Sequence, residues 1–443
     1  MESLRKVVAN MGFLLQVTGL LLILPIAIGL QRAELQSVAS LIATCFVAFG
    51  LGFVFNSFCE RKELDARTSL WLMILTFIAI PLVLMIPFVW NNVFGTANPL
   101  DLFSNAYFET ISGFTTTGFS FVYHPELLPS SLLFYRSLVE FIGGVGFIYI
   151  LIAFLYRETD LNEFTETFGI ERISGNLREL FLSILLIYTF FVAVFTGVFY
   201  LVYSRNLVVA SCTAIDILTG GYQPNITAGI GVFQVSILVL MLLGSLNFKF
   251  HYNLFHMKVR ELLTPEIKLF LVILASSTIA ISILAWVNPF DALFHVVSMA
   301  SSTGIDYMGI GATGLSAKIL FIIIGLLGGC AFSMAGGIRI ERVRKLANAV
   351  RRKGDQPTRD ELKSIVFYIV TFAATLLLLS FAFSTVGLGF LDSVFEVGSA
   401  LTTNGVSMGA TTIALPMVYK WLLVFAMIVG RVEILNLFKA IRG

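Results

Sequence analysis

The sequence predicts an all-α polytopic membrane protein with an internal fourfold repeat, and three observations lead to that prediction. The 443 residues are 57% hydrophobic with a mean hydropathy of +0.90, and only 13% are charged, which is about half the charged fraction of an average soluble domain. Apolar runs long enough to cross a bilayer recur along the whole chain. Short polar segments rich in Thr and Gly recur four times between these runs.

A helix needs about 20 apolar residues to cross the hydrocarbon core of a membrane. Ten segments meet this requirement, and they are residues 11–31, 37–57, 68–90, 131–155, 180–203, 231–255, 266–286, 317–347, 363–386 and 416–440. The first run follows Arg5 and Lys6 as the core of a signal peptide would. Because no small-residue cleavage site follows it, we expect a retained helix.

Four shorter apolar segments lie between these spans, near residues 103–114, 208–219, 291–302 and 392–402. Each has about 12 residues, or about 18 Å of helix, which is too short to cross. The distribution of Lys and Arg gives the orientation. With the N-terminus inside, 23 of the 29 basic residues fall on the cytoplasmic side. Both termini are then cytoplasmic, and the short segments all lie on the outer side.

The short segments share one sequence frame, aligned on Gly118, Gly221, Gly304 and Gly405. The first copy, F-E-T-I-S-G-F-T-T-T-G, and the fourth, F-E-V-G-S-A-L-T-T-N-G, match without a gap at Phe, Glu, Ser and two Thr. The second copy is the most divergent. The predicted units are an N-terminal helix pair at 1–62 and repeats at 63–157, 158–260, 261–354 and 355–443, with polar loops at 103–120, 208–223, 291–306 and 392–407.

Polar backbone at membrane depth is tolerated only where it lines a water-filled cavity or is buried in protein. A half-helix that ends midway carries about half a negative charge at its carboxyl end. Four such ends around a central pore would attract a cation, and the loop carbonyls would replace its hydration shell. Four copies in one frame disfavour ordinary turns. The candidate ion-binding residues are Thr116, Thr117, Gly118, Thr219, Gly220, Gly221, Ser302, Thr303, Gly304, Thr403, Asn404 and Gly405.

Five stretches together resemble the Trk/Ktr/HKT superfamily of potassium transporters, and the resemblance covers essentially the whole chain. They are S-G-F-T-T-T-G-F (112–119), F-Y-R-S-L-V-E-F-I-G-G-V-G (134–146), M-L-L-G-S-L-N-F-K-F-H-Y (241–252), G-G-C-A-F-S-M-A-G-G-I-R (328–339) and G-R-V-E-I (430–434). The two helices before the first repeat favour the TrkH-type pore-forming subunit over shorter members.

The resemblance implies that K⁺ is the transported ion and that the four frame glycines line its filter. It also implies a homodimer and a cytosolic nucleotide-binding regulatory subunit of the RCK/KTN type, similar to TrkA. No organic cofactor is expected in this chain. Two departures from the family pattern concern selectivity, since Asn404 is not apolar and Asp306 lies near the outer mouth.

The glycine-rich segment 325–337 has two interpretations. Small residues allow close packing of membrane helices, whereas glycines this dense also weaken a helix. The second interpretation is a break that forms a mobile loop under the filter, and the resemblance implies an intramembrane gate. Its candidate flexible residues are Gly328, Gly329, Ser333, Gly336 and Gly337.

Arg431 lies deep in an apolar run, where a charge indicates function. It forms either a salt bridge, with Glu433 or Glu140 as partner, or a positive barrier that faces the pore below the filter. Glu109, Glu396 and His295 occupy one position of the repeat frame, and we expect them to support the loops through hydrogen bonds. The acidic loop at 157–180 suits a docking surface for the regulatory subunit.

The function predicted from these features is potassium uptake into the cell by a channel-like mechanism. A sodium or mixed K⁺/Na⁺ transporter and an ion-coupled secondary transporter remain as alternatives. We expect no enzymatic activity, because the four His and four Cys are dispersed and give neither a metal-ligand spacing nor a catalytic cluster.

Overall fold

The computed structural model describes residues 2–58, 66–155, 177–222, 231–352, 354 and 356–433. At residues 2–4, 58, 66–67, 147–155 and 177–181, only the backbone is described. The predicted acidic docking loop at 157–180 therefore lies almost wholly outside the described residues, as does the last part of the predicted span 416–440.

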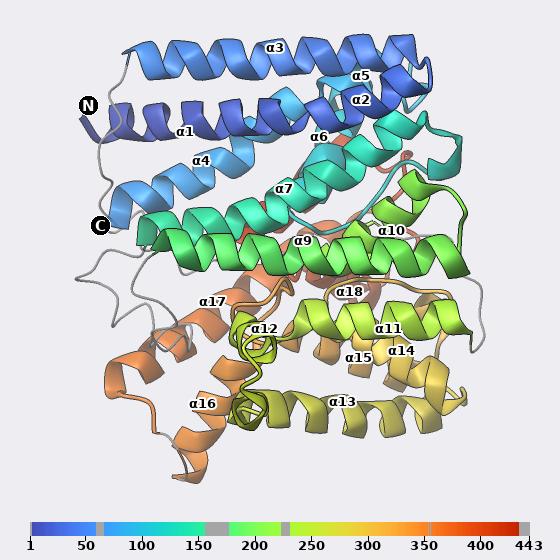
Figure 1. The fold of residues 1–443 in the computed structure, drawn as a ribbon. Helices are drawn as coiled ribbons and strands as arrows, with labels where there is room; N and C mark the ends of the chain where they lie inside the picture. The colour runs from blue at the N-terminus through green and yellow to red at the C-terminus, as the bar shows by residue number, and fades with distance from the viewer. Residues whose placement is uncertain are drawn as a thin grey trace.

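Every regular element within these ranges is a helix (Figure 1). The α-helices are α1 Glu2–Leu21, α2 Ile23–Gln31, α3 Leu35–Phe58, α4 Ala66–Leu84, α5 Ile86–Trp90, α6 Pro99–Phe114, α7 Ser130–Leu155, α9 Leu177–Val202, α10 Leu207–Thr219, α11 Val232–Ser245, α12 Phe248–Phe255, α13 Pro265–Leu284, α14 Pro289–Ala300, α15 Leu315–Leu327, α16 Ile340–Arg351, α17 Arg359–Ser384, α18 Phe390–Leu401 and α19 Met417–Val432. The predicted all-α membrane fold is confirmed.

The long helices run in nearly the same direction, as expected for membrane spans (Figure 1). In the described part of the chain, six helices are long and apolar enough to cross a membrane, or seven if the bent pair α11 and α12 counts as one. Their outer faces carry large apolar side chains such as Phe46, Leu378 and Phe381, each more than 70% exposed. Such faces suit lipid, and the polar groups lie inside.

Two of the predicted spans are wrong as single helices. The run at 231–255 bends by 107° between α11 and α12, because Asn247 caps the new helix by accepting the Phe250 N–H at 2.9 Å. The run at 317–347 stops at Leu327, and a loop of residues 328–339 separates it from α16. The dense glycines therefore mark a break in the helix, and the loop that they form packs closely against its neighbours.

The four short segments are the half-length helices α6, α10, α14 and α18, and each follows a spanning helix. Side chains of Asn98, Asn206 and Asn288 cap the first three by accepting backbone N–H groups. The first begins four residues earlier than predicted, because Asn98 and Pro99 form a helix start. Each half-helix is buried toward its carboxyl end, so these ends point into the protein.

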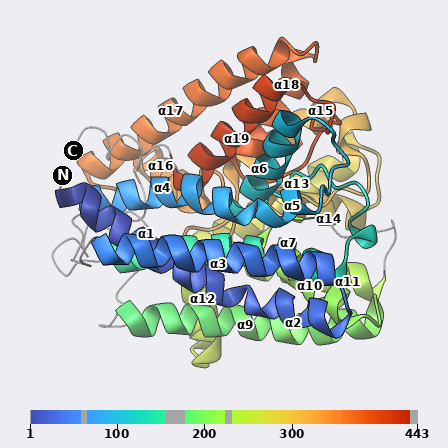
Figure 2. The same cartoon turned by 90° about the horizontal axis from the view of Figure 1, so that it is seen from above.

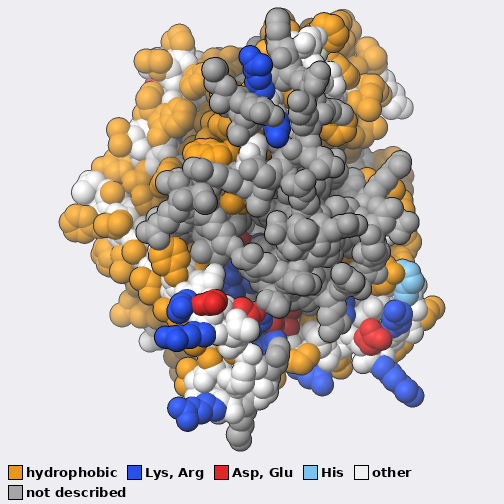
Figure 3. Space-filling model, turned by 90° about the vertical axis from the view of Figure 1, so that its left-hand side faces the viewer, with side chains coloured by type: hydrophobic (Ala, Val, Ile, Leu, Met, Phe, Trp, Pro, Cys, Tyr) orange, Lys and Arg blue, Asp and Glu red, His pale blue; other side chains and the backbone are white. Residues whose placement is uncertain are grey.

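The N-terminal pair α1 and α3 lies at one side of the molecule, where α1 packs against α4 of the first repeat (Figure 2). At the end that is on the left in Figure 1, most of the visible Lys and Arg side chains lie in the lower half of the surface, with some Asp and Glu among them, and others lie at the top (Figure 3). The exposed residues Lys258, Arg260, Arg351 and Arg352 belong to loops that the sequence predicts to be cytoplasmic.

Candidate ion-binding site

Four polar loops follow the half-helices, at residues 115–118, 220–222, 301–304 and 402–405, and they meet in a closed ring. A Cβ placed on Gly118 would lie 2.1 Å from the carbonyl oxygen of Gly221 in the next loop. The same close approach occurs around the ring, with Gly220 on the carbonyl of Ser302, Gly304 on that of Asn404, and Gly405 on that of Thr117. Each loop therefore contacts the next one through backbone alone, and the fourth returns to the first.

Three of the four loops share one backbone conformation, although their sequences differ. Thr116, Ser302 and Thr403 all have φ between 51° and 57°, and the glycine two residues later is also left-handed in each loop. In the second loop, Gly220 caps α10 with φ of 79°, and Gly221 is not left-handed. The conformation of Gly220 thus corresponds to that of Thr116, and the second copy is shifted by one residue from the sequence frame.

The loop N–H groups bond back to the half-helices. The Ser112 carbonyl accepts the N–H groups of Thr117 at 2.8 Å and Gly118 at 3.4 Å. The Asp216 carbonyl accepts the N–H groups of Gly220 at 3.1 Å and Gly221 at 3.0 Å. In this second loop, each donor is one residue closer in sequence to its acceptor than in the first loop. This difference supports the shift in the second loop.

Several polar side chains of the loops turn back into the protein, whereas the hydroxyls of Thr116 and Thr403 have no hydrogen-bond partner. The hydroxyls of Thr115 and Thr117 are 2.8 Å apart, as are those of Ser301 and Thr303. The amide of Asn404 is fully buried and donates to the Met299 carbonyl of α14 at 2.7 Å. Asn404 therefore ties the fourth loop to the third half-helix.

The predicted supports are confirmed at all three positions of the frame. Glu109 accepts the Phe121 N–H at 2.9 Å, and Glu396 accepts the N–H groups of Met408 and Thr411, both at 2.8 Å. His295 Nε2 accepts the N–H groups of Tyr307 and Met308 at 3.3 and 3.2 Å. Each side chain holds the chain segment that leaves its loop.

The second loop takes its support from another helix, which sequence reasoning missed. Glu140 of α7 accepts the Tyr222 N–H at 3.1 Å and the Thr219 hydroxyl. Arg136, one turn earlier on α7, pairs with Glu109 at 2.9 Å and lies over the Tyr222 ring at 3.5 Å. Two charges spaced four residues apart in an apolar run were the available signal, since that spacing places both on one helix face.

Glycines of the following helices contact the carboxyl ends of three half-helices. A Cβ on Gly143 would lie 1.8 Å from the Phe114 carbonyl oxygen, and one on Gly430 would lie 2.1 Å from that of Leu401. Gly244 approaches the Leu218 carbonyl in the same way. The spanning helix thus packs directly against the end of the half-helix, which positions each polar loop.

The glycine-rich loop, residues 328–339, lies immediately beneath the ring. The Gly336 N–H donates to the Ser302 hydroxyl at 3.0 Å, and a Cβ on Gly336 would lie 2.3 Å from the Thr402 carbonyl oxygen. Gly328 and Gly337 are left-handed at the two ends of the loop, with φ of 69° and 90°. Gly329 packs against Ser245, and the Ser333 hydroxyl donates to the Cys330 carbonyl at 2.7 Å.

Arg431 contacts this loop directly. Its guanidinium donates to the Met334 carbonyl at 3.3 Å and to the Gly144 carbonyl of α7 at 3.4 Å. Glu433, one of its two predicted partners, pairs with Arg339 at 2.8 Å and with Arg342 at 2.6 Å. Arg431 therefore joins α19, α7 and the glycine-rich loop below the ring.

Asp306, beyond the third loop, accepts the N–H groups of Met308, Gly309 and Ile310 at 2.7–3.0 Å, so its carboxylate orders the outer segment.

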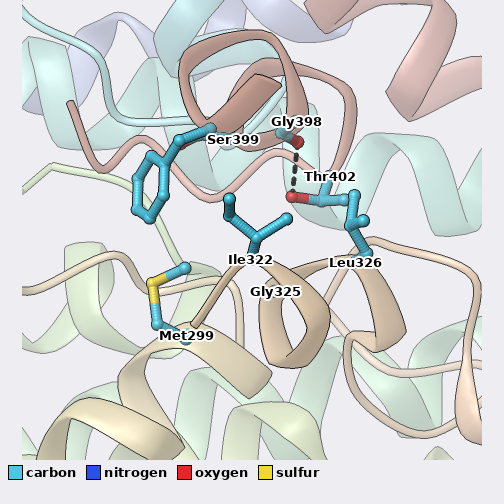
Figure 4. A pocket seen from close by; sticks show the side chains of 8 residues that line it. Met299, Ile322, Gly325, Leu326, Gly398, Ser399 and Thr402 are labelled. Carbon is cyan, nitrogen blue, oxygen red and sulfur yellow. Dashed lines mark hydrogen bonds between the residues drawn. The ribbon is translucent and has the colours of Figure 1, made fainter. Parts of the chain in front are cut away.

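A small pocket lies behind the ring, between α14, α15 and α18 (Figure 4). Its lining is uncharged, and Thr402 there donates to the Gly398 carbonyl at 2.8 Å. Most of the side chains that line this pocket are apolar.

Comparison with known proteins agrees with this geometry. Residues 269–441 match the TrkH family, described as cation transport proteins. An uncharacterized cation transporter of Methanocaldococcus jannaschii is 27% identical over 98% of this chain and 94% of its own length. The Trk system potassium uptake protein TrkI of Halomonas elongata is 28% identical over 83% of this chain and 80% of its own.

The crystal structure of the potassium transporter TrkH from Vibrio parahaemolyticus superposes with a TM-score of 0.83, at 21% identity and 98% coverage of both chains. Fold and site together define a multi-pass membrane protein for cation transport, built from four repeats around a central pore. Over residues 269–441 the chain matches the TrkH family, and its fold is similar to that of the TrkH crystal structure.

Proposed function

We propose that this protein takes up potassium across the cell membrane through a filter formed by the four polar loops. The closed ring of loop contacts carries the proposal, because a ring of backbone groups at the ends of four half-helices is suited to a dehydrated cation. The half-helix dipoles add negative potential at the same place. The proposed units are the N-terminal pair at 1–62 and the four repeats named above.

The proposed filter consists of Thr116, Thr117, Gly118, Thr219, Gly220, Gly221, Ser302, Thr303, Gly304, Thr403, Asn404 and Gly405. K⁺ would lie at the level of the frame glycines Gly118, Gly221, Gly304 and Gly405. Several loop N–H groups and the hydroxyls of Thr115, Thr117, Ser301 and Thr303 bond within the protein. Carbonyl oxygens, together with the unpaired hydroxyls of Thr116 and Thr403, are the groups available to an ion. The potassium named for several relatives supports K⁺ as the substrate.

The glycine-rich loop is the proposed gate, with Gly328, Gly329, Ser333, Gly336 and Gly337 as its flexible residues and Arg431 as an electrostatic barrier. The contacts of Gly336 with the ring and of Arg431 with the Met334 carbonyl support this role. An ordered loop directly beneath the ring would obstruct the path of an ion toward the cytoplasm.

The membrane potential is the proposed driving force. A monovalent cation gains about 2.3 kcal/mol per 100 mV on entering a negative interior. Uptake then requires neither nucleotide hydrolysis by this chain nor a coupling ion.

The proposal includes cytoplasmic N- and C-termini, a homodimer, and regulation by a cytosolic RCK/KTN-type, TrkA-like subunit. The basic surface of Figure 3 supports the orientation through the positive-inside rule. Relatives named as parts of a Trk system support a partner subunit.

Uptake of ⁸⁶Rb⁺ into liposomes that contain the purified protein tests this function. We expect potential-driven uptake that K⁺ inhibits much better than Na⁺ does. Equal inhibition by Na⁺ would favour a mixed transporter, and uptake that depends on a proton or sodium gradient would favour a coupled secondary transporter.

A further inference from the structure

The glycine-rich loop is bonded to the junction between α11 and α12. The Cys330 N–H donates to the Ser245 carbonyl at 3.0 Å, and the Met334 N–H donates to the Gly244 carbonyl at 3.1 Å. In the other direction, the Phe248 N–H donates to the Phe332 carbonyl at 3.1 Å. Three backbone hydrogen bonds therefore fasten the loop to the break in the second repeat.

One carboxylate joins both sides of this contact. Glu266 is in the first turn of α13 and is 7% exposed. Its Oε1 accepts the Ala331 N–H of the loop at 2.6 Å, and its Oε2 accepts the Asn247 amide of the junction at 2.9 Å.

Both groups that bond to Glu266 can act only as hydrogen-bond donors in this arrangement. A backbone N–H, such as that of Ala331, only donates. The amide of Asn247 has one orientation, because its Oδ1 accepts the Phe250 N–H at 2.9 Å and its NH₂ group then faces Glu266. An ionised carboxylate accepts on both oxygens, whereas a glutamine accepts on only one.

The neighbouring charges on α16 are already paired with each other. Arg344 forms two hydrogen bonds with Glu341, both of 2.7 Å. The hydrogen bonds that join Glu266 to the loop and to the junction come from neutral groups, and their strength depends on the acceptor. A charged acceptor roughly doubles the strength of such a bond.

We propose that Glu266 is a positioning residue that latches the glycine-rich loop beneath the ring, and that loss of one acceptor oxygen releases the loop. This inference rests on the proposed role of that loop as the gate. It assigns Glu266 to the closed conformation and gives it no part in ion selectivity, because its bonds are with the loop and the junction and not with the four polar loops.

The test compares Glu266→Gln with the exchange variant Asn247→Asp/Glu266→Gln in ⁸⁶Rb⁺ uptake. In the single variant, the NH₂ group of the new glutamine faces either the Ala331 N–H or the Asn247 amide, which are both donors, so one hydrogen bond is lost. We expect uptake to rise about tenfold, because one hydrogen bond to a charged group has an energy on that scale. The preference for K⁺ over Na⁺ should stay unchanged.

The exchange variant moves the carboxylate from α13 to the junction. The new carboxylate at position 247 still accepts the Phe250 N–H and also accepts from the new amide at position 266. The oxygen of that amide is then free to accept the Ala331 N–H, so every donor keeps an acceptor and uptake should return close to the original rate.

This variant also controls for folding, since a merely damaged protein would not recover. Uptake by Glu266→Gln at the original rate, or no recovery in the exchange variant, would overturn the latch.

A second readout does not require conduction. Cys330 lies in the loop and is fully buried, so its reaction with an impermeant methanethiosulfonate reagent reports release of the loop. In a background with Cys45, Cys59 and Cys212 replaced by Ser, we expect faster reaction in Glu266→Gln than in the parent or the exchange variant. Absence of ⁸⁶Rb⁺ uptake in the parent would contradict the proposed function, whereas equal thiol rates in all three proteins would contradict the latch itself.

Discussion

The ring of polar loops and the glycine-rich loop beneath it lie in contact but are held in different ways. The ring occurs in four copies, and its members touch through backbone atoms at glycines, with Cβ positions 1.8–2.7 Å from a neighbouring carbonyl oxygen. The lower loop occurs once, and beside its backbone bonds to the α11–α12 junction it is fastened by single side chains such as Glu266 and Arg431. The comparison teaches that the ring resists movement, whereas a few bonds decide the position of the loop.

The largest effect is expected from a side chain inside the ring. Gly118→Ala places a methyl group against the Gly221 carbonyl, 2.1 Å from its oxygen, at a residue with φ of 84°. Neither the backbone contact nor the left-handed conformation accommodates it. We expect ⁸⁶Rb⁺ uptake to be lost.

Gly197→Ala is the matched control for this substitution. Gly197 lies in α9, and a Cβ there would meet no atom within 4 Å. Normal uptake by Gly118→Ala would show that the ring is not the ion path.

The second prediction concerns the lower loop. Arg431→Ala removes both a positive charge below the ring and a bond to the Met334 carbonyl. We expect uptake to rise about tenfold, which corresponds to about 1.4 kcal/mol of barrier. The control is Arg205→Ala, which replaces an exposed arginine far along the chain from this site and should leave uptake unchanged. An unchanged rate in Arg431→Ala would show that Arg431 is not part of the gate.

An intermediate effect is expected from the supports behind the ring. Glu396→Gln replaces one of the two oxygens that accept the N–H groups of Met408 and Thr411 by an NH₂ group, which cannot accept. Leaving one buried N–H group without an acceptor costs about 1–3 kcal/mol of stability. The fourth loop should then lose its fixed geometry, and the preference for Rb⁺ over Na⁺ should fall while transport continues. Glu126→Gln, on the exposed outer turn, is the control. An unaltered ion preference in Glu396→Gln would assign this carboxylate to folding alone.

The smallest effect is expected at Asn404. Asn404→Leu removes the bond to the Met299 carbonyl at 2.7 Å but leaves the backbone of the fourth loop in the ring. We expect a loss of selectivity smaller than that of Glu396→Gln, measured in the same competition assay. A larger loss would mean that the amide, and not the ring, sets the ion preference.

The half-helices and their loops were predictable because three copies share a sequence frame and because Asn or Pro residues start the helices. The second copy was placed in the wrong backbone register, since Gly220 and Gly221 are adjacent and the sequence does not distinguish which one caps α10. The support from Glu140 was missed because it comes from a neighbouring repeat, and such a contact depends on tertiary packing.

The bend after α11 was hidden for a different reason. Residues 231–244 are mostly apolar and make the run look like a span. Asn247 is only one of several polar residues that follow, with Ser245, Lys249, His251 and Asn253, so its capping signal does not stand out. The latch of Glu266 follows from that bend, because Asn247 reaches the carboxylate only when α12 turns away. A run of apolar residues predicts a crossing helix. The break itself comes from the local cap by Asn247, and backbone bonds from Cys330 and Met334 hold the chain there.

The most direct test of the ring as an ion-binding site is an experimental structure with Rb⁺ in place of K⁺, examined by anomalous scattering. The account predicts a strong Rb⁺ peak at the centre of the four loops, surrounded by carbonyl oxygens from every one of them. Loops that stand apart, or Rb⁺ bound elsewhere along the path with none at that centre, would contradict it.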